Sequence, residues 1–214
     1  MNRRERIIEL TMRMFVSQGI KSVRMDDIAQ QLGVSKRTLY DYFDDKEQLL
    51  YEAMACYAEQ SRLRWAKARS GARNVLEALF MVLGEIMDHS ETDGRMMENL
   101  RRCYPAVYGR LMGEGSERNR QEFRDMLEEG IAEGFFVDTI NVDLAISVLY
   151  YSASALVVHR DLALPGNISE RDALVQIVST FFRGISTARG LELIDDFLKR
   201  REAERKRRQE PERP

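Results

Sequence analysis

Side chains that could bind an anionic partner are concentrated in one short stretch, Lys36-Arg37-Thr38-Leu39-Tyr40-Asp41-Tyr42. Arginine and lysine donate hydrogen bonds to O6 and N7 of guanine, and hydroxyl groups donate to phosphate oxygens. If the stretch is helical, Lys36, Arg37 and Tyr40 share its outer face, because residues three and four apart are neighbours on a helix. The stretch therefore predicts a surface that binds double-stranded DNA.

The residues around this stretch, from about 24 to 43, have the spacing of a helix-turn-helix. Two short amphipathic segments flank the turn Gly33-Val34-Ser35. Gly33 can adopt the positive φ that ends one helix, and Ser35 can cap the next. The positions expected to face inward are apolar: Ile28, Ala29, Leu32, Val34, Leu39 and Phe43. The second helix of such a motif enters the major groove with its N-terminal part.

The expected DNA contacts follow from this geometry. They are Ser35, Lys36, Arg37, Thr38, Tyr40, Asp41, Tyr42 and Lys46. Those on the outer, N-terminal part of the second helix are expected to meet base edges, whereas Thr38, Tyr42 and Lys46 lie at its rim and would meet phosphates. Lys46 also lies in the first turn of the following helix, where backbone amides favour an anion.

Composition excludes several other classes of protein. The net charge is −2, and residues 1–50 hold nine Lys/Arg against eight Asp/Glu, so charge alone neither supports nor excludes DNA binding. Cys56 and Cys103 lie far apart, so neither a disulfide framework nor a metal site is predicted. We find no nucleophile elbow, P-loop or dinucleotide fingerprint, and expect neither enzymatic activity nor a cofactor. With no secretory pattern and no apolar run long enough for a bilayer, a soluble, cytoplasmic protein without membrane contact is expected.

The hydrophobic period is helical almost throughout, which predicts an all-α fold. We expect an N-terminal three-helix domain over residues 1–50, a larger helical domain over 51–198, and a charged, disordered tail over 199–214. A long helix is expected from Asp44–Asp45 to about Arg69. Beyond Gly71 the expected helices are about 74–89, 95–103, 116–133, 143–159 and 169–188, with breaks at Asp93-Gly94, Pro105 and Gly113–Gly115. Asn141 and Ser169 are expected to cap the last two.

Residues 3–50 resemble the DNA-binding domain of the TetR family of transcriptional regulators. The resemblance lies in R-E-R-I-I, M-F-V-S-Q-G and D-I-A-Q-Q-L-G-V-S-K-R-T-L-Y-D-Y-F-D-D-K-E-Q-L-L. It implies a two-domain, all-helical homodimer that binds a near-palindromic operator, and a larger domain that often binds a small effector. Arg24 and Met25 depart from the family by replacing a frequent threonine. Asp26 occupies a position that is often basic, so it either reduces affinity for DNA or caps the helix.

The larger domain resembles the family only in helix layout. Its last two long helices are its most apolar, with apolar residues on more than one face, which suggests burial on more than one side. The resemblance implies that such a pair forms a four-helix dimer interface, and the residues expected there are Leu149, Leu156, Ile177, Val178, Phe181, Phe182 and Ile185. The alternative is an ordinary monomer core. Methionines and aromatics in the middle helices favour a pocket for an apolar or amphipathic effector, although plain core is the alternative for each. The candidates are Trp65, Phe80, Met81, Met97, Tyr104, Tyr108, Phe123 and Met126.

These observations favour a ligand-responsive repressor. Two other interpretations remain open at this point. The first is a DNA-binding protein of the same fold that a protein partner controls, for which a filled core in the larger domain would be evidence. The second is a helical interaction module that has lost DNA binding, for which failure to bind any DNA at low salt would be evidence.

Overall fold

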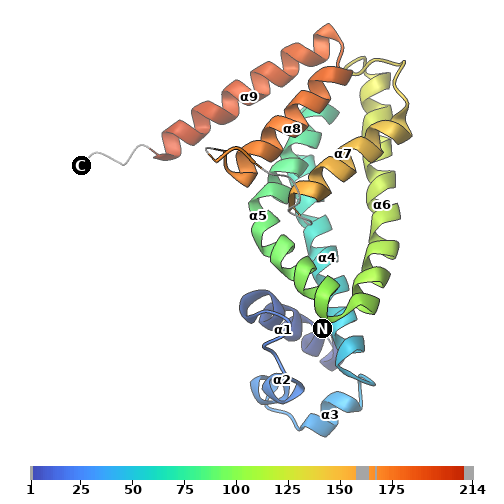
Figure 1. Cartoon of the computed structure of the whole chain (residues 1–214), viewed down its shortest axis with the longest axis vertical. Helices are drawn as coiled ribbons and strands as arrows, with labels where there is room; N and C mark the ends of the chain where they lie inside the picture. Colours follow the sequence, from blue (N-terminus) through green and yellow to red (C-terminus); the bar gives the residue numbers. More distant parts are fainter. Residues whose placement is uncertain (1, 158–163, 167, 210–214) are drawn as a thin grey trace, which may run out of the picture.

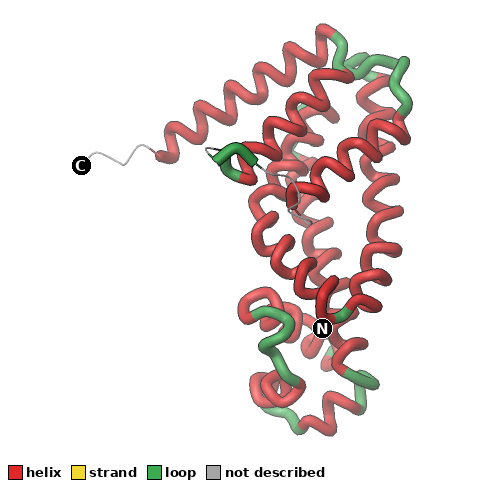
Figure 2. The backbone as a smooth tube through the Cα atoms, in the orientation of Figure 1, coloured by secondary structure: helices red, strands yellow, loops and turns green. Residues whose placement is uncertain are grey.

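The computed structural model describes residues 2–157, 164–166 and 168–209, and its described part is helical with no strand (Figures 1 and 2). The helices are α1 (Arg3–Gln18), α2 (Met25–Leu32), α3 (Lys36–Tyr40), α4 (Lys46–Ser70), α5 (Val75–Cys103), α6 (Pro105–Ala132), α7 (Val142–Val157), α8 (Glu170–Ile185) and α9 (Ala188–Gln209). The predicted all-α class is therefore confirmed. Figure 1 shows α1 to α3 as a small unit at one end, joined by α4 to the larger bundle.

Local capping fixes the ends of the first helices. Gly33 is left-handed, with φ 66°, and ends α2 as its sequence position predicts. The Ser35 hydroxyl accepts a hydrogen bond from the Thr38 amide at 3.1 Å and so begins α3. Asp45 caps α4 by accepting from the Gln48 amide at 2.7 Å. These caps act within four residues, which is why the sequence alone predicts them.

Two predicted breaks are wrong. α5 continues through Gly94, and α6 continues through Gly113 and Gly115. A glycine inside a helix costs only about 1 kcal/mol relative to alanine, and the packing of a long helix against its neighbours exceeds that cost. The break at Pro105 is confirmed: proline lacks the amide hydrogen needed to continue α5, but it fits the first turn of α6.

The C-terminal part also differs from the expectation. The helix expected over 169–188 ends at Ile185, and α9 then runs to Gln209, through much of the segment expected to be a disordered tail. Residues 210–214 and the end of the helix expected over 143–159 lie outside the described residues. The caps at Asn141 and Ser169 are confirmed, since they accept from the amides of Leu144 and Asp172 at 3.0 and 3.1 Å.

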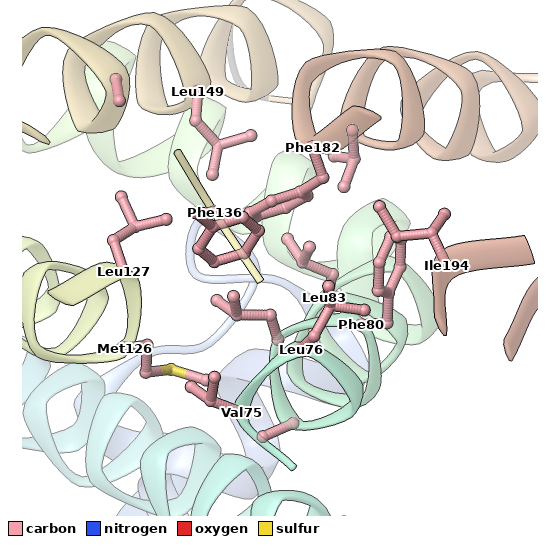
Figure 3. Packing of buried hydrophobic residues seen from close by; sticks show 14 of the residues in the cluster. Val75, Leu76, Phe80, Leu83, Met126, Leu127, Phe136, Leu149, Phe182 and Ile194 are labelled. Carbon is pink, nitrogen blue, oxygen red and sulfur yellow. The ribbon is translucent and has the colours of Figure 1, made fainter. Parts of the chain in front are cut away.

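Two hydrophobic cores position the candidate sites. The C-terminal core contains side chains from α5, α6, α7, α8 and α9, some of which are shown in Figure 3. Within it the rings of Phe136 and Phe182 are stacked, with 5.8 Å between their centroids. The N-terminal core joins α1 to the first turns of α4. It also takes in Met96, Leu100 and Val107 from the corner between α5 and α6. The larger bundle therefore shares a core with the N-terminal three-helix unit and the start of α4.

Candidate functional site

The outer face of α3 collects the predicted DNA-binding residues. Ser35, Lys36, Arg37, Tyr40, Asp41 and Tyr42 are exposed, and Thr38 is half-buried. Leu39, in contrast, is fully buried and anchors α3 to the N-terminal core. The Ser35 and Thr38 hydroxyl groups lie 2.9 Å apart beside the helix start. The structure therefore brings these residues together on one surface, with one apolar side chain holding them in place.

Lys36 has a partner on the neighbouring helix. Its ammonium donates to Oδ2 of Asp26 in α2 at 3.0 Å. This hydrogen bond, together with the negative charge of Asp26, raises the pKa of Lys36 above its ordinary 10.5. Asp26 does not cap α2. That role falls to Asp27, which accepts from the Arg24 amide at 2.7 Å.

Lys46 lies at the edge of the N-terminal core, beside the corner between α5 and α6. Its ammonium donates to the Ile20 carbonyl at 3.2 Å and lies over the rings of Phe15 and Tyr104, 5.9 and 5.6 Å from their centroids. Lys46 is half-buried, unlike the exposed residues of α3. Its contacts show that it links α4 to α1 and to the α5–α6 corner. The phosphate contact expected of it remains a prediction.

A cavity of about 270 Å³ lies between α4 and α6. Its lining residues are Arg62, Trp65, Ala66 and Arg69 from α4, Val82 from α5, and Asn119, Glu122, Phe123 and Met126 from α6. Three of the predicted effector residues, Trp65, Phe123 and Met126, meet here. The other six lining residues were not predicted from the sequence. On both α4 and α6 the lining residues recur at i, i+3, i+4 and i+7, which is the signal that could have revealed them.

Ion pairs cross the rim of the cavity. Arg62 donates to Glu122 through Nη2 at 2.8 Å and through Nε at 3.1 Å, and Arg69 donates to Glu129 at 3.0 Å. The two pairs are one heptad apart on each helix, so α4 and α6 run in the same direction in constant register, as Figure 1 shows. The cavity therefore has apolar walls and, at its rim, two guanidinium groups that are each paired with a carboxylate.

The other predicted effector residues lie elsewhere. Phe80 is buried in the C-terminal core against Phe182 and Phe197, and Met81 packs on the edge of that core. Met97, Tyr104 and Tyr108 pack against the N-terminal core. The structure thus separates the eight candidates into a cavity group, a core group and a junction group.

A partly buried polar pair joins α4 to α5, and sequence reasoning did not find it. The Tyr57 hydroxyl donates to Asp93 at 2.6 Å, and the Arg64 guanidinium lies over the Tyr57 ring at 5.7 Å. Burial raises the pKa of Asp93, while the hydrogen bond from Tyr57 opposes that change. Burial also raises the pKa of Tyr57. The neutral phenol is therefore the donor in this pair.

The predicted dimerisation residues divide into two sets. Leu149, Leu156, Val178 and Phe182 are buried inside the chain's own C-terminal core, as Figure 3 shows for Leu149 and Phe182. In the single chain these four side chains are covered by the chain's own helices, and the dimer contacts expected of them remain a prediction. Ile177, Phe181 and Ile185 are half-buried at the edge of the core.

Three exposed apolar residues lie on α7, the first of the two helices expected to form the dimer interface, but are not among the interface residues named from the sequence. Leu144 is 62% exposed, Val148 46% and Tyr151 70%. Their spacing of i, i+4 and i+7 places them in one stripe along the helix. Large exposed apolar groups in such a stripe are typical of a surface that another protein covers. No helix in the described part of the chain is long and apolar enough to span a membrane.

Comparisons with known proteins agree with this arrangement. Residues 7–53 match the family model described as bacterial regulatory proteins, tetR family. The HTH-type transcriptional repressor KstR2 of Mycolicibacterium smegmatis is 26% identical over 147 residues, which cover 67% of this chain and 72% of that relative. A transcriptional regulator from Cytophaga hutchinsonii shares the fold with a TM-score of 0.73 and 17% identity, over 86% of this chain and 98% of that one. A regulator from Saccharomonospora viridis, solved in complex with choline, has a TM-score of 0.69 and 19% identity, over 86% and 97%.

Proposed function

We propose that this chain, a DNA-binding transcriptional regulator of the TetR family, is a dimeric repressor whose affinity for its operator is controlled by a small amphipathic molecule. The observation that carries the proposal is the outer face of α3, where Lys36, Arg37 and Tyr40 are exposed together. Side chains of this kind suit base edges in the major groove. They need a rigid support, which Leu39 supplies from the N-terminal core.

The experiment that tests DNA binding uses the intergenic DNA upstream of the protein's own gene. Nuclease footprinting on this DNA should reveal a protected inverted repeat, because a two-fold symmetric dimer reads two equivalent half-sites. Competition with unrelated DNA at physiological salt then measures the ratio of specific to non-specific affinity, because electrostatic attraction to phosphates is the same for every duplex. Binding that is equally weak on every duplex would contradict the proposal.

The cavity between α4 and α6 is the proposed effector site. Trp65, Val82 and Phe123 supply apolar walls, and Arg62 and Arg69 at the rim supply guanidinium groups that a ligand's anionic group could bind in place of their carboxylate partners. Such a lining fits a molecule with an apolar body and an anionic end group, of which decanoate is a simple probe. The anionic end would compete with Glu122 for Arg62, because both are carboxylates within reach of the same guanidinium.

Two structural links would carry the effect of the ligand to the DNA. α4 begins at the end of the helix-turn-helix and reaches the cavity without a proline or glycine inside it. The α5–α6 corner lies in the N-terminal core, so a change in the distance between α4 and α6 also acts there. A coupling of about 1–3 kcal/mol changes operator affinity about 5- to 150-fold. A ligand with equal affinity for both conformations would have no effect.

The dimer would form through α7 and α8. The stripe of Leu144, Val148 and Tyr151 is the proposed centre of the interface, with the half-buried Phe181 and Ile185 on the neighbouring helix. Obligate interfaces bury about 2,000 Å² or more and are rich in apolar side chains. Light scattering on the purified protein at micromolar concentration tests this directly, and a monomer would contradict it.

A further inference from the structure

Asp26 and Lys36 form an ion pair on the surface proposed to face DNA. The two side chains come from different helices of the helix-turn-helix, and their charged atoms are 3.0 Å apart. The pair is well exposed, with 65% of the Asp26 side chain and 49% of the Lys36 side chain accessible. Exposed pairs of this kind contribute little to folding stability. The effect of the Asp26–Lys36 pair must therefore be sought in what Lys36 can bind, rather than in the stability of the fold.

The simplest role for Asp26 would be to stabilise α2, because acidic side chains are favourable in the first turn of a helix. Asp27, however, lies in the same turn and already accepts the hydrogen bond from the Arg24 amide. The Asp26 carboxylate instead turns to Lys36 in α3. The contact thus connects the supporting helix to the proposed reading helix.

We propose that Asp26 is a specificity-determining residue, which prevents Lys36 from binding DNA phosphates without regard to sequence. This inference rests on the proposed function of the α3 surface. While Lys36 is paired, its charge is balanced by Asp26, and it releases fewer counterions from DNA. In a non-specific complex the pair must break, or the Asp26 carboxylate must approach the phosphates and repel them. A guanine in the correct register compensates by accepting from Lys36 through O6 and N7.

The charge balance of the N-terminal unit makes one carboxylate important. Residues 1–50 contain nine Lys/Arg and eight Asp/Glu, so their net charge is close to zero. The electrostatic part of non-specific binding depends on the charges that reach DNA phosphates, so a carboxylate beside Lys36 at the proposed interface matters more than this total. Replacing Asp26 with the nearly isosteric asparagine adds one net positive charge per protomer at the proposed interface and removes the carboxylate from Lys36.

The test compares wild type with Asp26→Asn on the footprinted operator and on a scrambled duplex of equal length, over a range of salt concentrations. On the scrambled duplex we expect about tenfold tighter binding, and a steeper log–log salt dependence, by about 0.9 for each lysine released. Operator affinity should change less, so the ratio of specific to non-specific binding falls. When Lys36 is already replaced by methionine, no ammonium can be released by Asp26→Asn. In this Lys36→Met background, Asp26→Asn should therefore steepen the salt dependence by less than half of its effect in the wild-type background.

Asp138→Asn is the matched control. It makes the same change of charge at an exposed site on the connection between α6 and α7, and should leave the specificity ratio unchanged. If Asp26→Asn lowers only the melting temperature and leaves the ratio and salt dependence as in wild type, Asp26 is a helix-stabilising residue and the proposal is overturned. A rise in the ratio would also overturn it. If wild type binds no duplex at low salt, the DNA-binding function of α3 fails and the proposal fails with it.

Discussion

The Tyr57 hydroxyl of α4 donates a hydrogen bond to the Asp93 carboxylate of α5, with 2.6 Å between the two oxygens. This partly buried contact links two helices that connect the bundle to the N-terminal core. The Tyr57→Phe variant keeps the ring and removes only the donor. We expect it to lower the free energy of unfolding by about 1–3 kcal/mol, because Asp93 loses its hydrogen bond. Urea denaturation measures this, and Tyr40→Phe at an exposed position is the control.

The same variant should show a defined pH dependence. Burial raises the pKa of Asp93, and loss of the Tyr57 hydrogen bond should raise it further. A carboxyl with a raised pKa in the folded state destabilises the fold as it ionises, so the penalty is absent below its ordinary value of 3.8 and grows at higher pH. The loss of stability should therefore be larger at pH 7 than at pH 4. An equal loss at both values would contradict this account.

Base readout by Arg37 is the second prediction. Arg37→Ala should weaken operator binding by about 1–3 kcal/mol and relax discrimination at one base position in each half-site. Tyr42→Phe should weaken binding to all DNA more evenly, because a phosphate contact carries no direct sequence information. Titration against a set of singly substituted operators separates the two patterns. Lys67→Ala is the control, because Lys67 is exposed on the part of α4 that lies in the larger domain. It should leave both operator affinity and base discrimination unchanged.

The third prediction places the dimer interface on the exposed stripe of α7. Val148→Asp should abolish the dimer without unfolding the chain, because the side chain is exposed in the protomer and the charge would be buried without a partner in the dimer. Leu63→Asp is the control, since Leu63 is also an exposed apolar residue, at 62%, but lies on α4 outside the stripe. Sedimentation and circular dichroism give the mass and the helical content. A dimer in the Val148→Asp variant would place the interface elsewhere.

The fourth prediction uses the chain's one tryptophan as a probe of the cavity. Decanoate should change Trp65 fluorescence, raise the melting temperature and lower operator affinity. Ala66→Leu should prevent all three effects by filling the cavity, whereas Ala68→Leu, outside the lining, should not. If decanoate binds at Trp65 and leaves operator affinity unchanged, the cavity binds this molecule but does not regulate DNA binding through it.

The fifth prediction concerns the attachment of α9. Glu77 of α5 is 4% exposed and accepts hydrogen bonds from Arg73 and from Arg200 of α9. Arg73 above all, with Arg200, lowers the pKa of Glu77 to about 2, against the opposing effect of burial. Its charged form contributes roughly 3 kcal/mol of stability at neutral pH, which is lost as the pH falls from about 4.5 towards 2.

Glu77→Gln tests this contribution. The variant should be less stable than wild type at pH 7, and the difference should shrink as the pH falls to 3. Glu192→Gln, at an exposed position of α9, controls for the general effect of acid on the protein. Thermal unfolding at several pH values is the measurement. A difference that stays constant with pH would show that the ionisation of Glu77 is not involved.

The sequence by itself determined what depends on near neighbours along the chain. Gly33 ends α2, Ser35 begins α3, and Leu39 faces inward while Arg37 and Tyr40 face outward. Each of these features follows from helix period or from a hydrogen bond that spans three residues, so no knowledge of the rest of the fold was needed. The helix-turn-helix and its resemblance to a known family were therefore accessible from residues 3–50.

Only the tertiary structure decided which face of each long helix packs in a core, which lies at the surface, and which helices are its neighbours. Phe182 and Phe181 are adjacent in an apolar helix, yet one is fully buried in the chain's own core and the other lies at its edge. Arg62 and Glu122 meet across 60 residues, and helix period places neither of them beside the other. Burial, cavities and ion pairs of this kind arise from the packing of distant segments, and a periodic pattern gives the faces of a helix without naming their neighbours.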